Sequence, residues 1–567
     1  MILRVRTKDG MFRLTVNDGG KFMDVVNQLY EKIGSVENLT ISDKPGDKGK
    51  SVVEFGDLEV KEMGLKNGDM LFASYESGNK PANDNDVDMN SGSVSISKPS
   101  IAQSKTAVSG KAFEELPIDK YLDSQNGLIK RNKSNLCRHG DKGMCEYCAP
   151  LPPWDKDYKE SQGIKHLSFY AYLKQLNDSK NNKNNATSYM APLDEPNYAV
   201  DKKCTAGHLP YPKGICSKCQ PSVISLQQQS FRMVDHVMFS DSSILNNFID
   251  SWRSSGTQRY GILYGSYESY DKVPLGIKAN VEFIYEPPQS DELDGLTLLD
   301  WSNEKDVDAL AAQFGLYKVG VIFTDLTDSG MKNGTVLCKR HKDSYFLSCL
   351  EVLMAGRNQL KYPNRTKYSN SKEFSSKFVT CVVSGGLNGD IEPRSYQVSV
   401  NAEALIKADV ITSSTQPSMM YINESNNERY VPDVFYSKIN EYGLEVKTNA
   451  KPAFPIDYLL VTLSDSFPLE PKPLFNSPHG YIIENREFLG ESQNLSTLYK
   501  HLNNDIGDGK VLFDFHLLMY LYSTNILHKE EWELIVNFVK SGNKEDFMKL
   551  IESPGWMSLI TILENSS

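Results

Sequence analysis

The spacing of apolar residues divides the chain into segments with different predicted structure. Apolar and polar positions alternate over Ile2–Arg6 and again over Phe12–Val16, on both sides of a Lys8-Asp9-Gly10 turn, which predicts a β-hairpin. Apolar residues then recur at helical spacing and predict a helix with one buried face: Phe22, Val25, Val26, Leu29, Tyr30 and Ile33. The first part of the chain is therefore expected to lay a helix on a sheet.

The segment Gly64–Phe72 resembles the turn and last strand of ubiquitin-like modules. Together with the hairpin and helix before it, this segment predicts a ubiquitin-like (UBX-like) β-grasp domain over residues 1–76, which is a docking surface and not a catalyst. Gly49-Lys50-Ser51 matches the end of a phosphate-binding loop, but Lys44 stands where that motif requires a glycine. Nucleotide binding is not expected here.

Residues 77–110 change in composition to Asn, Asp, Ser, Lys and Pro, with almost no aromatic residues. A segment of this kind is too polar to bury a core. It is expected to be a flexible linker that acts as a passive tether.

Residues 223–430 mix helical and strand-like patterns. These predict helices at Ile244–Arg253, Val307–Phe314 and Tyr345–Gln359, and strands at Tyr260–Tyr267, Ile277–Tyr285 and Lys318–Phe323. Beyond them, residues 431–567 have an extended segment at Tyr458–Leu463 and are mainly helical from Val511 on. Pro554 is placed to sit in the first turn of a last helix that runs to Glu564.

The composition and net charge indicate which class of protein the chain belongs to and which kind of partner it binds. At 567 residues, with 40% hydrophobic and 24% charged residues, the chain is expected to form several globular domains. Its net charge of −11 argues against nucleic acid as the main partner and favours protein partners. The start, MILRVRTKDG, lacks the apolar region of a signal peptide, and about 18 consecutive apolar residues occur nowhere, so a soluble cytosolic or nuclear protein is expected.

Six of the nine cysteines fall into two sets that each contain one histidine. The sets are Cys137-x-His139-x5-Cys145-x2-Cys148 and Cys204-x3-His208-x7-Cys216-x2-Cys219. Zinc takes thiolate and imidazole ligands in a tetrahedron, and a Cys-x2-Cys pair supplies two thiolates on one side of it. Since protein ligands fill all four positions, the sequence predicts two structural zinc ions and no metal-bound water.

Longer motifs around these sets, and further along the chain, resemble the nuclear protein localization protein 4 family. The resemblance is carried by Leu136–Gly140, Cys145–Cys148, Gly207–Pro210, Gly214–Pro221, Pro274–Ile277, Ile284–Gln289, Ile322–Leu326, Tyr430–Tyr436 and Phe513–Leu518. These motifs extend from about residue 110 to the end of the chain, and the ubiquitin-like module stands before them as in the family.

The resemblance implies a substrate-recruiting adaptor. Members of the family pair with ubiquitin-fusion-degradation protein 1 and sit on a hexameric AAA+ ATPase of the valosin-containing-protein type. They deliver polyubiquitinated proteins to it for unfolding and proteasomal degradation, including endoplasmic-reticulum-associated degradation. In the family the N-terminal module contacts the ATPase N domain, the zinc knots stand on the ATPase ring, and an MPN-fold domain helps to bind and open a ubiquitin.

The resemblance also implies a multidomain α+β fold and a location. The expected domains are a β-grasp at 1–76, a linker at 77–110, a double zinc-finger region at 111–222, an inactive α/β MPN domain at 223–430 and a largely helical C-terminal domain at 431–567. Some relatives end in an extra four-cysteine finger; here the last cysteine is Cys381, so a fungal-like form without that finger is expected. The expected location is the cytoplasm and nucleus, and the endoplasmic reticulum and nuclear envelope through partners, without direct membrane insertion.

Catalytic MPN domains cleave ubiquitin chains with a zinc-bound water, which a His-x-His-Pro pair and an Asp hold and a Glu activates. In this chain the two histidine positions align with Phe323 and Asp325, the Asp position with Glu351 after Ser348, and the Glu position with Gln258. Phe323 cannot ligate a metal and Gln258 cannot accept a proton, so a pseudoenzyme is expected.

Three hypotheses follow for the function. The favoured one is a non-catalytic ubiquitin-binding adaptor of the ATPase. The second is a metal-dependent deubiquitinase whose substitute ligands would be Asp325, Glu351 and the nearby His341. The third is a zinc-finger RNA-binding protein, which the net charge disfavours.

Overall fold

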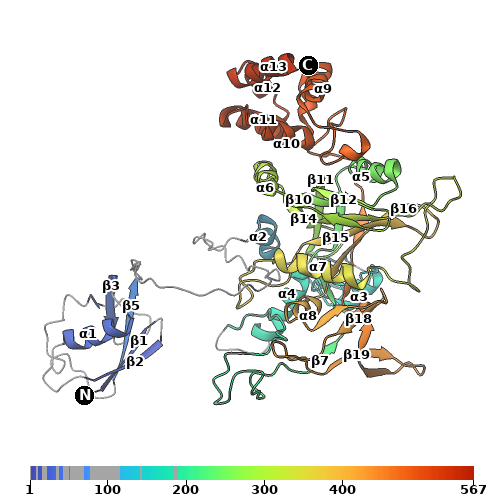
Figure 1. Cartoon of the computed structure of the whole chain (residues 1–567). Coiled ribbons are helices and arrows are strands. Elements are labelled where there is room, and N and C mark those ends of the chain that lie inside the picture. Colours follow the sequence, from blue (N-terminus) through green and yellow to red (C-terminus); the bar gives the residue numbers. More distant parts are fainter. Residues whose placement is uncertain are drawn as a thin grey trace, which may run out of the picture. The chain divides into compact units, whose positions relative to one another are not determined.

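A computed structural model describes residues 2–7, 10–15, 22–33, 37–42, 50–51, 69–76, 115–133, 135–140, 143–182 and 189–566. Contacts divide the chain into two compact units, unit 1 at Met1–Ala107 and unit 2 at Val108–Ser567 (Figure 1). The predicted linker at 77–110 lies outside the described residues. None of the helices in the described part of the chain has the length and apolar run needed to cross a bilayer.

Unit 1 forms, among its described residues, a mixed five-stranded sheet with the order β2-β1-β5-β3-β4. Its elements are β1 (Ile2–Thr7), β2 (Gly10–Thr15), α1 (Phe22–Ile33), β3 (Glu37–Ser42), β4 (Lys50–Ser51) and β5 (Met70–Glu76). The hairpin β1–β2 is antiparallel, whereas β1 pairs in parallel with the last strand β5. A parallel pair in the centre, with one helix between the hairpin and β3, is the β-grasp arrangement that the sequence predicts.

The helix α1 buries the face that its apolar spacing predicts. Phe22, Val25, Val26 and Leu29 are fully buried, as are the strand residues Leu3, Val5 and Leu14. Lys50 and Ser51, which match the end of a phosphate-binding loop in sequence, instead form β4 and pair with Ile41 and Thr40 of β3.

Unit 2 is built on an eight-stranded sheet with the order β22-β16-β15-β14-β10-β11-β9-β23. Its strands are β9 (His236–Phe239), β10 (Tyr260–Tyr270), β11 (Gly276–Tyr285), β14 (Tyr317–Asp325), β15 (Val379–Gly385), β16 (Ile391–Val398), β22 (Leu460–Thr462) and β23 (Ser464–Ser466). The three strands predicted between Tyr260 and Phe323 are confirmed. They lie at the centre of the sheet, where β10 pairs with both β11 and β14.

Helices cover both faces of this sheet and create two hydrophobic cores. One core includes residues of α6 (Glu304–Gln313), α7 (Cys349–Lys361) and α8 (Val400–Lys407). The other includes residues of α2 (Pro117–Ser124), α4 (Phe169–Asn177) and α5 (Ser242–Ser255). On α2, the buried Asp119 pairs with Lys377 at 2.7 Å and accepts a hydrogen bond from Tyr170, so this short helix is tied to α4 and to the segment before β15.

The helix predicted from Tyr345 begins four residues later, at Cys349. The Ser348 side chain accepts a hydrogen bond from the Glu351 N–H, while the Glu351 carboxylate accepts one from the Ser348 N–H at 2.7 Å. This reciprocal capping box fixes the first turn, so residues before Ser348 cannot continue the helix.

The sheet does not end at Tyr430, because β22 and β23 occupy its two edges. After them come the helices α9 (Leu495–Asp505), α10 (Phe515–Ser523), α11 (Lys529–Ser541), α12 (Lys544–Ile551) and α13 (Pro554–Ser566), which Figure 1 shows grouped at one end of unit 2. Phe515 of α10 stacks on Phe283 of β11 at 3.7 Å, so this helical part shares the core of the sheet. The predicted domain boundary at 430/431 stays a prediction.

Unit 2 also contains shorter elements. They are α3 (Lys156–Ser161), β6 (Leu167–Ser168) paired with β8 (Phe231–Arg232), β12 (Gln289–Asp291) paired with β13 (Leu296–Leu298), β17 (Ile411–Ser413), β18 (Met419–Ile422) and β21 (Ala453–Pro455) in one sheet, and β7 (Ile224–Leu226), β19 (Val434–Ile439) and β20 (Glu445–Asn449) in another. The strand β7 begins five residues after Cys219, so the second cysteine set leads directly into the β7–β19 pair.

Candidate metal centres

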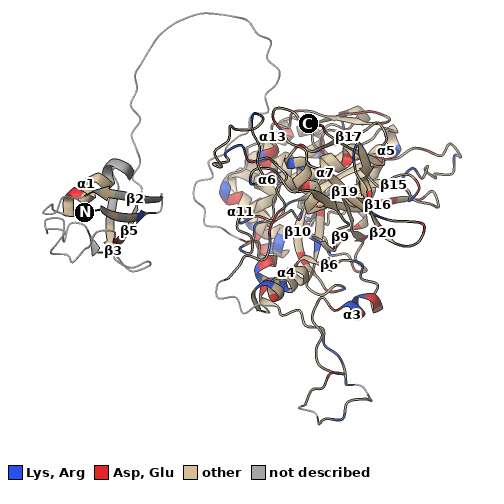
Figure 2. Cartoon of the chain, turned by 90° about the horizontal axis from the view of Figure 1, so that it is seen from below, with Lys and Arg blue, Asp and Glu red and all other residues tan. Residues whose placement is uncertain are grey.

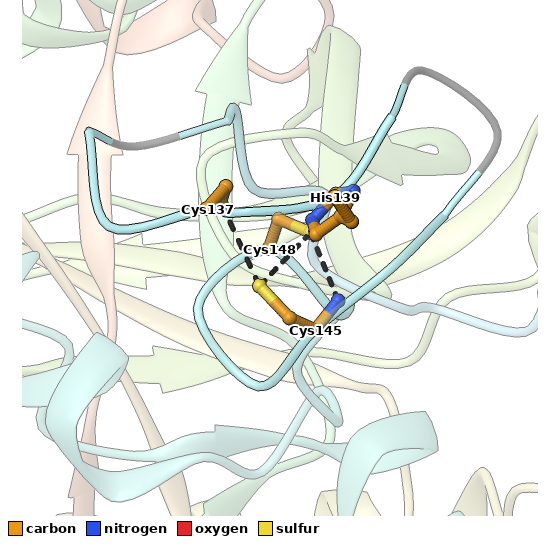
Figure 3. Close-up of side chains that lie close together, drawn as sticks. All are labelled: Cys137, His139, Cys145 and Cys148. Carbon is orange, nitrogen blue, oxygen red and sulfur yellow. Dashed lines mark hydrogen bonds between the residues drawn. The ribbon is translucent and has the colours of Figure 1, made fainter.

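The first cysteine set comes together in space from loops without regular secondary structure (Figure 3). The Sγ atom of Cys145 lies 3.7 Å from that of Cys137 and 3.8 Å from that of Cys148. The Nε2 atom of His139 lies 3.1 Å from the Cys148 Sγ. The four candidate ligand atoms are all within 4.8 Å of one another.

The second set repeats this arrangement. The Cys216 Sγ lies 3.7 Å from the sulfurs of both Cys204 and Cys219, and the His208 Nε2 lies 3.5 Å from the Cys219 Sγ. The four ligand atoms again lie within 4.8 Å of one another. The structure therefore brings all eight predicted ligands together in two groups of four.

The spacing within each group suits a zinc ion. With Zn–S distances of about 2.3 Å and tetrahedral angles, two sulfurs bound to one ion lie about 3.8 Å apart. The sulfur separations given above are 3.7 and 3.8 Å in the first group and 3.7 Å in the second. Two clusters of three cysteines and one histidine are thus positioned to bind a metal.

Backbone hydrogen bonds orient the ligands in the same way in both clusters. The Nδ1 atoms of His139 and His208 lie 2.9 and 2.7 Å from the carbonyl oxygens of Gly140 and Leu209. A ring that donates its Nδ1 hydrogen to a carbonyl oxygen carries its lone pair on Nε2, the atom that faces the sulfurs. Backbone N–H groups of Lys218 and Cys219 lower the pKa of the Cys216 thiol to about 6, which favours the thiolate form that binds metal.

Each cluster has a glycine next to its histidine. The structure shows why a residue without a side chain is needed at this position. A Cβ atom on Gly143 would lie 3.1 Å from the His139 Cβ, and one on Gly214 would lie 2.6 Å from the Leu209 carbonyl oxygen. Both glycines stand two residues before the first cysteine of a Cys-x2-Cys pair. The repeat is therefore Gly-x-Cys-x2-Cys-x-Pro, in which glycine leaves room for the histidine loop.

Neighbouring side chains anchor each cluster to the rest of unit 2. Arg131 donates hydrogen bonds to the carbonyl oxygens of Ala149, at 2.8 Å, and Glu146. In the second cluster the Tyr211 hydroxyl donates to the Arg429 carbonyl oxygen at 2.9 Å, and Gln220 donates to the Tyr430 hydroxyl at 2.6 Å. These two contacts join positions 218 and 210 residues apart in sequence, so local spacing gave no signal for them.

The aligned MPN positions also come together, around a separate cavity of about 370 Å³. Gln258, Phe323, Asp325, Ser348 and Glu351 all line it. The side chain of Gln258 is fully engaged: its oxygen accepts from the Thr324 hydroxyl and the Leu326 N–H, and its nitrogen donates to the Leu293 and Leu326 carbonyl oxygens. Through these hydrogen bonds the Gln258 side chain fixes the end of β14.

Asp325 and Glu351, two of the acidic residues that line this cavity, share a cationic partner that the sequence reasoning missed. Arg340 contacts Asp325 at 2.8 Å and Glu351 at 2.6 Å. Burial alone would raise the pKa of Asp325, but Arg340 and Lys339 outweigh it and lower that pKa. His341 accepts a hydrogen bond from the Asp343 N–H and joins no metal-binding group, since such groups among the described residues are the two cysteine clusters.

Known proteins similar to this chain align with it end to end. The nuclear protein localization protein 4 of Debaryomyces hansenii is 60% identical over 567 aligned residues, which cover 98% of this chain and 100% of that protein. The proteins of the same name from Scheffersomyces stipitis and Saccharomyces cerevisiae are 59% and 50% identical and cover 100% of this chain. A solved β-grasp-like domain from Arabidopsis thaliana is 22% identical, covers 14% of this chain and 92% of its own, and has a TM-score of 0.12.

Family models match almost all of unit 2. The model of the NPL4 family matches residues 259–564, and the model for the zinc-binding region of that family matches residues 113–256. The second match contains all eight residues of the two metal-positioned clusters. On these matches and the full-length identities, the chain belongs to the NPL4 family.

Proposed function

We propose that this chain is a non-catalytic adaptor that recruits polyubiquitinated proteins to a hexameric AAA+ ATPase of the valosin-containing-protein type. It acts with ubiquitin-fusion-degradation protein 1, and its substrates are unfolded for proteasomal degradation, including endoplasmic-reticulum-associated degradation. The observation that carries this proposal is the full-length match to the NPL4 family, 60% identical across 100% of one relative. The family resemblance supplies the adaptor role.

The parts of the chain divide this work in the proposal. Unit 1 docks on the ATPase N domain, and the two cysteine clusters with their loops, the zinc knots, stand on the ATPase ring. Each knot holds one structural zinc ion through Cys137, His139, Cys145 and Cys148, or through Cys204, His208, Cys216 and Cys219. The central sheet is an MPN domain that handles ubiquitin together with the C-terminal helices.

The zinc ions in this proposal are structural because each cluster offers four protein ligands to a four-coordinate ion. The ligands come from loops that lack regular secondary structure. These loops are too short to bury a hydrophobic core of their own, so metal binding supplies the free energy that keeps them folded. No coordination position is left for water or substrate.

The absence of catalysis in this proposal is supported by the cavity at the end of β14. Phe323 offers no ligand atom, Gln258 is occupied by four hydrogen bonds, and Asp325 and Glu351 are both paired with Arg340. A metal-bound water would require those carboxylates to leave the arginine.

Charge supports protein partners over nucleic acid. The net charge is −11, and in Figure 2 acidic and basic residues are interspersed along the ribbon of unit 2. We place the protein in the cytoplasm and nucleus, and at the endoplasmic reticulum and nuclear envelope through its partners. A salt titration tests the nucleic-acid alternative, since steep salt-dependent binding to RNA would contradict the proposal.

The function is tested by reconstitution. The ATPase, the partner and this chain are mixed with a polyubiquitinated fluorescent protein, and loss of fluorescence is followed with ATP present. We expect unfolding that requires this chain, and none when the substrate lacks ubiquitin. Unfolding at the same rate without this chain would refute the adaptor role.

A second assay addresses catalysis directly. The purified chain is incubated with ubiquitin chains and added zinc, and no free ubiquitin is expected. Cleavage that is abolished both by a chelator and by Asp325→Ala, but not by Asp343→Ala on the exposed loop, would establish the deubiquitinase hypothesis instead.

A further inference from the structure

The guanidinium of Arg340 is held by hydrogen bonds from every side. Its Nε donates to the Asp325 Oδ2 at 2.8 Å, and its Nη2 lies 2.8 Å from the same oxygen. Its Nη1 donates to the Glu351 Oε2 at 2.8 Å and to the Phe346 carbonyl oxygen at 2.9 Å, while its Nη2 donates to the Glu351 Oε1 at 2.6 Å. Four hydrogen bonds and one further ion-pair contact therefore engage all three nitrogens of the guanidinium.

The surroundings of this guanidinium are those of a buried cation. The Arg340 side chain is only 3% exposed, and its Cζ lies 5.9 Å from the ring centroid of Phe323 and 5.4 Å from that of Tyr345. Aromatic faces at these distances attract a cation. The second oxygen of Asp325 is bound by Lys339 at 3.0 Å, so Asp325 and Glu351 are both paired with cations.

The carboxylates that Arg340 joins are those at the aligned metal-ligand positions. The aligned positions are Phe323, Asp325 and Glu351, and the set does not fit a catalytic zinc ion, since one member is a phenyl ring and the others already share a cation. The charge that a divalent ion would bring to this place is thus supplied by the chain itself.

We propose that the guanidinium of Arg340 takes the structural place of a metal ion, as a resident cation that fastens the end of β14 to the start of α7. This inference rests on the proposed inactive MPN fold. Asp325 ends β14, Glu351 lies in the capping box of α7, and Arg340 belongs to the intervening segment 326–348. The wall of the 370 Å³ cavity is therefore held without metal, and its shape is independent of metal supply.

Removal of the arginine should uncover the two carboxylates as a cation site. In Arg340→Ala the side chain that fills the space is gone, so Glu351 loses its cationic partner and Asp325 keeps only Lys339. Carboxylate oxygens suit Mn²⁺, whereas the thiolate-rich knots prefer zinc, so zinc-loaded protein is titrated with Mn²⁺. Free Mn²⁺ is counted by its electron paramagnetic resonance signal, and the melting temperature is recorded with and without Mn²⁺.

We expect Arg340→Ala to bind one Mn²⁺ more than the wild type and to melt on the order of 5 °C lower without Mn²⁺, with part of that loss recovered when Mn²⁺ is added. Two matched variants are controls. Arg340→Lys keeps a cation in place and should exclude Mn²⁺. The triple variant Arg340→Ala, Asp325→Asn, Glu351→Gln removes the repulsion and should melt above Arg340→Ala yet ignore Mn²⁺.

The proposal is overturned if Arg340→Ala takes up no additional Mn²⁺, or if it melts like the wild type in metal-free buffer. If Arg340→Ala does not fold in that buffer, refolding decides the matter: recovery in Mn²⁺ but not in K⁺ supports the stand-in role, and recovery in neither overturns it. The reconstituted unfolding assay and the chain-cleavage assay on the wild-type chain test the proposed function, so its failure would be seen separately from that of the Mn²⁺ experiment.

Discussion

At the scale of single residues, the eight candidate metal ligands make a prediction that can be counted. We expect two zinc ions per chain by atomic absorption, and one fewer in Cys145→Ser and in Cys216→Ser, because a hydroxyl is a much weaker zinc ligand than a thiolate. Cys338→Ser, a thiol outside both clusters, is the matched control and should keep both ions. Two ions retained in both knot variants would show that the ligand assignment is wrong.

A buried carboxyl makes a residue-scale prediction about pH. Glu403 of α8 accepts hydrogen bonds from Gln359 and from Ser375, and burial raises its pKa to about 8. The unfolded chain releases this proton near pH 4.3, so the folded state holds it over a range in which the unfolded state does not. The stability from this group is therefore complete below about pH 4.3 and is lost as the pH rises through about 8.

Glu403→Gln should remove that loss, because the amide keeps the hydrogen bonds and does not titrate. We expect the urea midpoint of the wild type to fall more between pH 6 and pH 9 than that of Glu403→Gln, by a difference worth a few kcal/mol. Glu530→Gln, on the exposed side of α11, is the control and should follow the wild type. Parallel pH profiles for the wild type and Glu403→Gln would contradict the buried-proton account.

At the scale of elements, the repeated knot explains why each histidine loop needs a glycine beside it. A methyl group at Gly214 would meet the Leu209 carbonyl oxygen at 2.6 Å, and backbone at this distance must move. Because that loop carries His208, Gly214→Ala should weaken zinc binding in the second knot. The measurement is the rate of zinc release to a chromogenic chelator, with an increase of about tenfold expected.

The control for this prediction lies in the first knot. A Cβ atom on Gly140 would meet nothing within 4 Å, so Gly140→Ala should release zinc at the wild-type rate. Gly143→Ala, whose Cβ would lie 3.1 Å from the His139 Cβ, should fall between the two. Equal release rates in Gly140→Ala and Gly214→Ala would refute the crowding argument.

The elements show how far the sequence could predict the fold and the site. Hydrophobic spacing predicts α5, β10, β11 and β14 because burial on a regular element is a local, periodic property. The eight ligands are predictable for a similar reason, since the ligand pattern lies within short loops. The contacts of Arg340 are not predictable in this way, because Arg340 lies in an irregular segment between β14 and α7 that has no periodic spacing. The Tyr211–Tyr430 contact is not predictable either, because it joins segments far apart in the sequence.

At the scale of the whole molecule, the two units carry separate hydrophobic cores. Leu3, Val5, Phe22 and Leu29 are fully buried within unit 1, whereas the two core clusters of unit 2 contain residues from Ile118 onward. Deletion of residues 1–76 therefore removes the hydrophobic core of unit 1 and none of the residues in the two core clusters of unit 2. The deleted chain should keep its zinc content and the melting transition of unit 2.

Because the cores are separate, a binding experiment can test whether unit 1 serves ATPase docking and unit 2 serves ubiquitin binding. If unit 1 docks on the ATPase N domain while the knots stand on the ring, two contacts act together, and loss of one lowers the effective concentration of the other. We expect deletion of residues 1–76 to weaken ATPase binding on the order of 100-fold while ubiquitin-chain binding stays within about twofold of the wild type. Both affinities are measured on the same preparations, with unchanged zinc content as the control for folding. Equal losses of ATPase and ubiquitin binding would mean that unit 1 also takes part in ubiquitin recognition, and the proposed division between the two units would be wrong.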